Sequence, residues 1–243
     1  MKITRSSLFW SLVAAFACAS AALAADSNDG FKPIFDGKDL KGWEGDPRLW
    51  SVQDGAIVGQ TTPEKTIKTN TFLIWRAGTV DDFIIKFKFR MHGGNSGLQY
   101  RSKEFTDMHN WVVGGYQADM DAGNTYTGIL YEERGPRQIA AQRGQKVILQ
   151  PDGKKEVVGS VGTDADIKAA IKNEDWNEYV ITAQGNHLVQ QINGKTTVDV
   201  TDNDEKNRAM SGILAFQLHV GAPMKVEFKD VMLKRLPLGS KKN

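Results

Sequence analysis

Three segments of the sequence combine amide and ionisable side chains in a pattern that suits ligand chemistry. In each of them, polar residues alternate with apolar ones, and the polar members are Gln99 with Arg101, Gln117 with Asp119, and Gln217 with His219. Side chains two residues apart point to the same face of a β-strand. Each segment therefore predicts a strand with one apolar face and one face that displays an amide and an ionisable group.

Such polar rows favour recognition of a sugar. Amide and carboxylate groups supply the paired donors and acceptors that bind neighbouring hydroxyl groups. Gly93, Gly94 and Gly97 precede the first row and would let a ligand approach the backbone closely, so we expect Asn95 to join the amides in binding. The alternative is that each row is only the hydrated face of a sandwich.

A fourth candidate is the stretch from 126 to 138. Glu132 follows an apolar run and alternates with Tyr131, so we expect Glu132 to point inward and to be catalytic. The adjacent Glu133 is more typical of a solvated charge. Arg134 begins a glycine-containing loop and is expected to bind substrate.

His219 is the histidine best placed for chemistry, because it shares a strand face with Gln217. Histidine titrates near neutral pH and is a common general base. The sequence lacks a Gly-x-Ser-x-Gly elbow, a His-Glu-x-x-His motif, a P-loop and a dinucleotide fingerprint. It also lacks the Glu-x-Asp-x-x-Glu arrangement of sandwich-fold glucanases, which disfavours a two-carboxylate hydrolase.

The elements around these residues predict an all-β sandwich. Short strand-like runs alternate with glycine turns along the chain, and residues 83–90 alternate apolar with charged side chains. Gly185-Asn186 and Asn193-Gly194 are hairpin signals, and residues 151–154 mark a further turn. Residues 163–172 predict one short helix that begins at an N-cap threonine.

The N-terminus predicts export. Lys2 and Arg5 precede a short apolar stretch, and Ala22-Leu23-Ala24 offers a cleavage site, so residues 1–24 are interpreted as a signal peptide and 25–243 as one domain. The stretch is too short for a membrane anchor, and Cys18 follows a poor lipobox. We expect a periplasmic or secreted protein without stable membrane insertion after cleavage.

Charge and cysteine content exclude further classes of partner and of structural bond. Removal of Lys2 and Arg5 leaves equal numbers of basic and acidic residues, 29 each, which argues against a nucleic-acid partner. The single cysteine, Cys18, lies within the predicted signal, so the exported chain would contain neither a disulfide nor a cysteine metal site.

Several motifs together resemble the DUF1080 family, described as 3-keto-disaccharide hydrolases or 3-keto-glucoside-1,2-lyase/3-keto-2-hydroxy-glucal hydratases. They are "IFDGKDLKGW" (34–43), "WSVQDGAIVG" (50–59), "GNSGLQYRS" (94–102), "DWNEYVITAQGN" (175–186) and the closing segment 214–236. The resemblance implies a concanavalin A-like jelly-roll sandwich. It also implies that the partner is a glycoside or disaccharide already oxidised at C3. The segments "GYQADM" and "TGILYEERG" resemble one branch of the family, where other members often have Glu and Asp in the first segment.

The implied reaction needs a base and a group that stabilises an enolate oxygen. A ketone at C3 acidifies the C2 proton, so its removal can expel the C1 oxygen by β-elimination, and water can then add to the enone. His219 suits the base, while either Arg101 or a divalent metal held by Asp119 and Glu132 suits the enolate. Two non-catalytic alternatives remain: a lectin-like carbohydrate-binding module, and a subunit of a cell-surface assembly.

Overall fold

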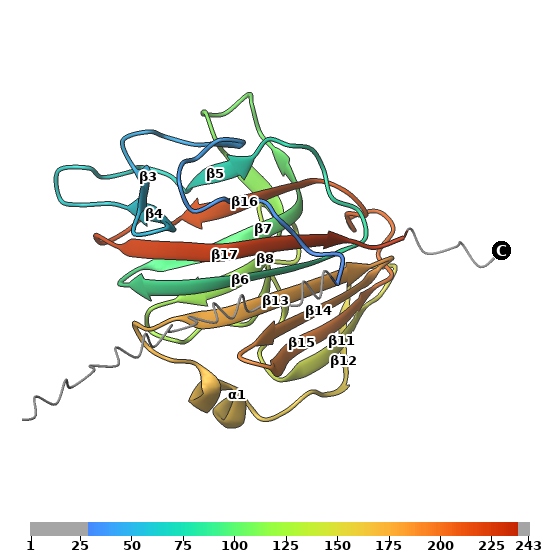
Figure 1. Cartoon of the computed structure of the whole chain (residues 1–243). Coiled ribbons are helices and arrows are strands. Elements are labelled where there is room, and N and C mark those ends of the chain that lie inside the picture. The colour runs from blue at the N-terminus through green and yellow to red at the C-terminus, as the bar shows by residue number, and fades with distance from the viewer. Residues whose placement is uncertain (1–28, 238–243) are drawn as a thin grey trace, which may run out of the picture.

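The computed structural model describes residues 29–237. The predicted signal peptide and Cys18 lie outside the described residues. Within 29–237 the chain forms a ten-stranded and a seven-stranded sheet with one short helix (Figure 1). The predicted all-β sandwich is confirmed.

The seven-stranded sheet is the one that holds the site. Its strand order is β10-β9-β8-β7-β16-β5-β2, and each neighbouring pair is antiparallel. The strands are β10 (Ile139–Ala141), β9 (Leu130–Glu133), β8 (Val113–Asp121), β7 (Asn95–Glu104), β16 (Ile213–Leu218), β5 (Thr71–Trp75) and β2 (Trp43–Glu44).

The ten-stranded sheet packs against it. Its order is β12-β11-β15-β14-β13-β6-β17-β4-β3, with β1 paired to β17. The strands are β12 (Lys155–Ser160), β11 (Gln145–Leu149), β15 (Lys195–Asp202), β14 (His187–Ile192), β13 (Asn177–Gln184), β6 (Phe83–His92), β17 (Lys225–Arg235), β4 (Ala56–Gln60), β3 (Trp50–Gln53) and β1 (Lys32–Pro33).

Alternation along the strands determines which side chains fill the core. In β6 every second residue from Phe83 to Met91 is buried, while the residues between them remain half-buried. Phe216 of the seven-stranded sheet stacks on Phe228 of the other sheet, with ring centroids 3.8 Å apart. Phe216 also meets Phe87 edge-on at 5.4 Å. Interlocked aromatic side chains therefore hold the two layers together.

The local signals in the sequence are confirmed. The helix α1 (Asp164–Ala170) begins at Thr163, whose hydroxyl accepts a hydrogen bond from the backbone N–H of Asp166. Gly185 and Asn193 adopt positive φ in the turns that follow β13 and β14.

Within residues 29–237, no helix is long and apolar enough to span a bilayer.

The outer face of the seven-stranded sheet is divided into two parts. Phe72, Ile74, Val113 and Ala215 form a second, smaller apolar cluster there, with Trp111 packed against it. The neighbouring part of the same face, formed by β7, β8 and β9, carries polar side chains instead. This polar part forms the candidate site.

Substitution of Gly212 by alanine is expected to destabilise the fold. Gly212 exchanges two backbone hydrogen bonds with Val80, and a Cβ at this position would lie 2.3 Å from the carbonyl carbon of Arg101 and 2.5 Å from the carbonyl oxygen of Ser102. Backbone atoms cannot move aside cheaply, so we expect a loss of about 1 to 3 kcal/mol of unfolding free energy.

Urea unfolding measures this loss. Gly159→Ala is the control, because the nearest atoms to a Cβ at Gly159 are side-chain carbons of Lys146 at 3.7 Å or more. Equal stability of Gly212→Ala and Gly159→Ala would contradict the close backbone approach at Gly212.

Candidate functional site

The amide side chains predicted to share a face do lie together. Gln99 of β7 is opposite Gln117 of β8, and Gln117 is opposite Tyr131 of β9. The Gln99 Nε2 atom donates to Gln117 Oε1 at 2.7 Å, and Gln117 Nε2 lies 3.3 Å from Gln217 Oε1. All three glutamines are buried. A connected amide network thus lies on the outer face of the sheet.

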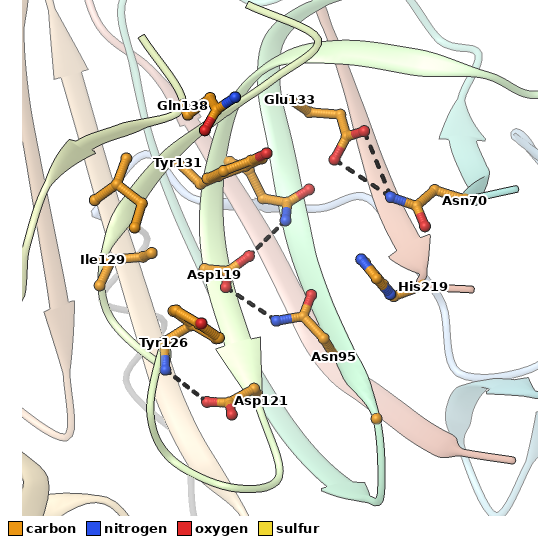
Figure 2. A pocket seen from close by; sticks show the side chains of 13 residues that line it. Asn70, Asn95, Asp119, Asp121, Tyr126, Ile129, Tyr131, Glu133, Gln138 and His219 are labelled. Atoms are coloured by element: carbon orange, nitrogen blue, oxygen red, sulfur yellow. Dashed lines mark hydrogen bonds between the residues drawn. The ribbon is translucent and has the colours of Figure 1, made fainter. Parts of the chain in front are cut away.

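Beside this network lies a cleft of about 400 Å³. Its volume is within the usual range for small-ligand sites. Figure 2 shows Asp119 between Tyr126 and Ile129 on one side and His219 on the other. The residues that line the cleft are Asn70, Gly94, Asn95, Gln117, Asp119, Asp121, Tyr126, Ile129, Tyr131, Glu133, Gln138, Ile139 and His219.

Asp119 is the buried carboxylate of the cleft. Its Oδ1 accepts from Gln117 Nε2 at 2.5 Å and its Oδ2 accepts from Asn95 Nδ2 at 3.0 Å (Figure 2). Burial raises the pKa of Asp119 to about 7; the two hydrogen bonds oppose this shift, and the nearby carboxylates of Asp121 and Glu133 add to it.

A raised carboxyl pKa has a cost for the fold. The folded chain holds the Asp119 proton up to a pH of about 7, whereas an unfolded chain releases it near an ordinary pKa of about 4. Folding stability from this group is therefore present at low pH and is lost as the pH rises through about 7. Costly buried carboxyls of this kind are typical of functional sites.

Glu133, rather than Glu132, is the glutamate of the cleft. Its carboxylate accepts a hydrogen bond of 3.2 Å from Gln217 Nε2 and two of 3.4 Å from Asn70 Nδ2. Asn70 in turn accepts from the backbone N–H of Val220 through its Oδ1 atom at 2.9 Å. These bonds connect the end of β9 to the segments that flank β5 and β16.

His219 directly follows β16 and lines the cleft. Its Nδ1 atom lies 2.6 Å from the carbonyl oxygen of Val220. A carbonyl oxygen only accepts hydrogen bonds, so the proton of a neutral ring lies on Nδ1 and the lone pair lies on Nε2. In this tautomer Nε2 can accept a proton.

Glu132 points inward as expected, but away from the cleft. It is paired with the guanidinium of Arg137, whose Nη2 donates to Oε1 at 2.6 Å, and Arg137 also bonds Asp202 at 2.7 Å. Glu132 lies opposite Tyr116, whose ring is in the core. The expectation that Glu132 is catalytic in this cleft is therefore corrected: it is on the opposite face of the sheet and forms a buried ion pair.

A metal held jointly by Asp119 and Glu132 does not fit this geometry, because the two side chains point to opposite faces of one sheet. Among the residues that the structure describes, no group of three or more His, Cys, Asp or Glu side chains is arranged to hold a metal ion.

Arg101 does not share the face of Gln99, so this part of the strand prediction is wrong. Arg101 has a φ of 49°, and the pairing of β7 with β8 shifts between Tyr100 and Lys103. This bulge turns the guanidinium away from the cleft. It donates to the carbonyls of Asp81 at 2.7 Å and Gly185 at 2.6 Å and to the Asp82 carboxylate at 2.9 Å.

Arg101→Met is expected to lower stability by about 3 to 5 kcal/mol, because it removes one member of a buried ion pair. For a domain of this size the melting temperature would fall by roughly 6 to 20 °C. Lys88→Met is the control, since its pair with Asp230 is exposed and contributes about 1 kcal/mol or less. Thermal unfolding measures the melting temperatures of both variants. Equal melting temperatures would contradict a structural role for Arg101.

The remaining predicted residues divide into three groups. Asn95, Gln117, Asp119 and His219 line the cleft. Gln99 and Gln217 lie in the amide network that supports it, and Arg134 lines a neighbouring pocket instead. The sequence did not predict six polar residues of the cleft, namely Asn70, Asp121, Tyr126, Tyr131, Glu133 and Gln138.

Part of what was missed had a signal in the sequence. Tyr131 and Glu133 are two residues apart and share the outer face, as the alternation that placed Glu132 inward requires. Asn70 and Gln138 lie outside the strands. Their side chains reach the cleft through tertiary packing, for which the sequence offers no local signal.

The fold is similar to known sandwich proteins. A Parabacteroides distasonis protein named provisionally as a glycosyl hydrolase aligns with a TM-score of 0.56 at 19% identity, covering 86% of this chain and 95% of its own. The carbohydrate-binding module CBM66 of Bacillus subtilis aligns with a TM-score of 0.52 at 14% identity, covering 82% of this chain and 99% of its own. A Bacillus subtilis protein with a galectin-like fold aligns with a TM-score of 0.52 at 13% identity, covering 84% of this chain and 94% of its own.

These likenesses confirm the concanavalin A-like jelly-roll architecture. No curated protein matches the sequence. The family model for the 3-keto-alpha-glucoside-1,2-lyase-like domain matches residues 30–234, which include both sheets and the cleft. The chain belongs to the family of 3-keto-alpha-glucoside-1,2-lyase-like domains.

Proposed function

We propose that this protein cleaves glucosides that carry a ketone at C3, by β-elimination across C1 and C2. The observation that carries the proposal is a cleft in which Asp119, with a pKa of about 7, and His219, with its Nε2 lone pair available, line the same space. Family membership supplies the substrate class.

The reaction requires two proton transfers. A base removes the proton from C2, which the C3 ketone has acidified, and the C2–H electron pair forms an enolate. The enolate then forms the C1=C2 bond while the bond from C1 to the glycosidic oxygen breaks. That oxygen takes a proton and leaves as an alcohol, and water can add to the resulting enone.

His219 suits the first transfer and Asp119 the second. The Nε2 atom of His219 accepts a proton in the tautomer that the Val220 carbonyl fixes. Asp119 is protonated in a large fraction of molecules near neutral pH, because its pKa is raised to about 7. It can therefore act as the acid that protonates the leaving oxygen, as buried carboxyls do in other glycoside-cleaving enzymes.

The rest of the cleft suits a pyranose. Asn70, Asn95 and Gln138 offer amide groups for its hydroxyls. Ile129 and Tyr131 offer apolar surface for its C–H groups. Burial raises the pKa of Tyr131, and the nearby carboxylates of Glu133 and Asp119 raise it further, so this hydroxyl keeps its proton and remains a hydrogen-bond donor.

The proposal is tested with 4-nitrophenyl 3-keto-α-glucoside and the unoxidised glucoside, each with and without a chelator. We expect nitrophenol release from the keto substrate alone. Release from both substrates at similar rates would point to ordinary hydrolysis and contradict elimination. Chelator sensitivity would add a metal ion to the reaction.

A carbohydrate-binding module is the alternative, because the fold is shared with one. Release from neither substrate, combined with calorimetric binding of the unoxidised glucoside, would favour the module. A binder has no need of a buried carboxyl with a pKa of about 7, and this difference favours the enzyme.

A further inference from the structure

A second pocket, of about 330 Å³, adjoins the cleft. Gly115 of β8 and Glu133 of β9 are paired and line it, while the next pair on the same face, Gln117 and Tyr131, lines the cleft. Two residues along a strand span about 7 Å. The two spaces therefore meet at Glu133, which lines both, and the second pocket also reaches Glu132 on the opposite face of the sheet.

Three cations without ionic partners line this second pocket. They are Lys103, Arg134 and Lys206, and within residues 29–237 none of them forms an ion pair. The other charges at the pocket are compensated or point elsewhere. Arg101 bonds Asp82, and Glu132 bonds Arg137.

The Glu133 carboxylate does not cancel this charge locally. It is bonded to Asn70 and to Gln217 in the cleft, and Figure 2 shows it directed toward Asn70. The second pocket therefore has a net positive lining, in contrast to the cleft, which contains Asp119, Asp121 and Glu133.

Two of these three cations lie beside an aromatic ring. The Nζ atom of Lys103 lies 4.9 Å from the centroid of the Phe105 ring, and the guanidinium carbon of Arg134 lies 5.9 Å from it. The absence of a side chain at Gly114 makes room for this ring, because a Cβ there would lie 2.8 Å from a ring carbon of Phe105. The pocket thus offers one flat apolar surface and separate positive charges.

We propose that this pocket binds the leaving group of the substrate and prefers a leaving group that bears a carboxylate. The inference rests on the proposed function, since a pyranose beside Asp119 and His219 must direct its C1 substituent out of the cleft. The second pocket adjoins the cleft at Glu133, and its positively charged lining begins two residues along β9 from Tyr131 of the cleft. Dispersed single cations beside an aromatic ring suit a carboxylate on a planar body.

The test compares 4-carboxyphenyl with 4-carbamoylphenyl 3-keto-α-glucoside, which differ in charge but little in shape. We expect the ratio of their kcat/KM values in the wild type to exceed that in Lys103→Gln/Lys206→Gln by about 3- to 30-fold at low ionic strength. Added salt should reduce the difference. Lys195→Gln, an exposed lysine in a hairpin on the other sheet, is the control and should keep the wild-type ratio.

The outcomes separate this proposal from the proposed function. Equal ratios in the wild type and the double variant would overturn the carboxylate site while leaving elimination intact. If neither substrate turns over, the proposed function fails. Calorimetry with the unoxidised 4-carboxyphenyl and 4-carbamoylphenyl glucosides then tests whether the pocket binds a carboxylate. Tighter binding of the carboxylate that is lost in the double variant supports the site, and equal binding overturns it.

Discussion

Asp119→Asn is expected to slow cleavage of a 3-keto glucoside with a poor leaving group, such as methanol, by roughly 100- to 10,000-fold. An amide at this position cannot donate a proton to the departing oxygen. With 4-nitrophenol as leaving group the loss should be much smaller, because this phenolate departs without protonation. Steady-state rates on the two substrates measure the difference.

The pH dependence of activity shows whether Asp119 acts as an acid or as a base. If Asp119 acts as an acid, wild-type activity on the methyl glycoside falls as the pH rises through about 7, because the carboxyl loses its proton there. Asp119→Asn should lack this decline. Activity that rises with pH through about 7 would identify Asp119 as the base instead. Asp39→Asn, at an exposed carboxylate, serves as the control.

His219→Gln is expected to slow cleavage of both substrates, again by roughly 100- to 10,000-fold. Removal of the C2 proton precedes departure of any leaving group, so a good leaving group cannot compensate for a missing base. Glutamine can still donate to the Val220 carbonyl that His219 contacts, and the fold should persist. Turnover at the wild-type rate would show that His219 is not the base.

A matched histidine outside the cleft controls for this change. His187 lies on the ten-stranded sheet, exposed and 2.8 Å from an Asp199 oxygen, and His187→Gln should retain wild-type turnover. The contrast between the two site variants is itself diagnostic. Loss that depends on the leaving group belongs to the acid, and loss that does not depend on it belongs to the base.

The fold could be predicted from the sequence because its signals are local. The alternation in residues 83–90 appears as the half-buried strand β6, and the N-cap at Thr163 begins α1. Asn193-Gly194 forms the turn between β14 and β15. In each case a few neighbouring residues determine the backbone conformation, and the pattern can be recognised without knowledge of distant contacts.

The site could be predicted only in part, because strand alternation fails at a bulge. The rule placed Gln117 and Asp119 on one face correctly, but the positive φ of Arg101 turns its side chain into an ion pair with Asp82. A residue with left-handed backbone geometry inside a strand has no reliable sequence signal when it is not glycine. Alternation therefore identifies a face only between bulges.

The glutamate pair illustrates a second limit. Glu132 was the predicted catalytic glutamate and Glu133 was interpreted as a solvated charge, and the apolar run before Glu132 indicated its burial correctly. Burial does not distinguish a substrate cleft from a structural ion pair. That distinction depends on Arg137, which reaches back from the following loop to bond Glu132 and Asp202, and on Asn70, which lies 63 residues from Glu133.

The most direct test of the account is cleavage of a 3-keto-α-glucoside in D₂O, followed by NMR of the 3-keto sugar product. Elimination and rehydration exchange the C2 proton, so the account predicts deuterium at C2 in product formed by the wild type, and far less in free 3-keto sugar incubated for the same time without enzyme. Full cleavage with the original proton retained at C2 would contradict elimination and indicate direct displacement at C1.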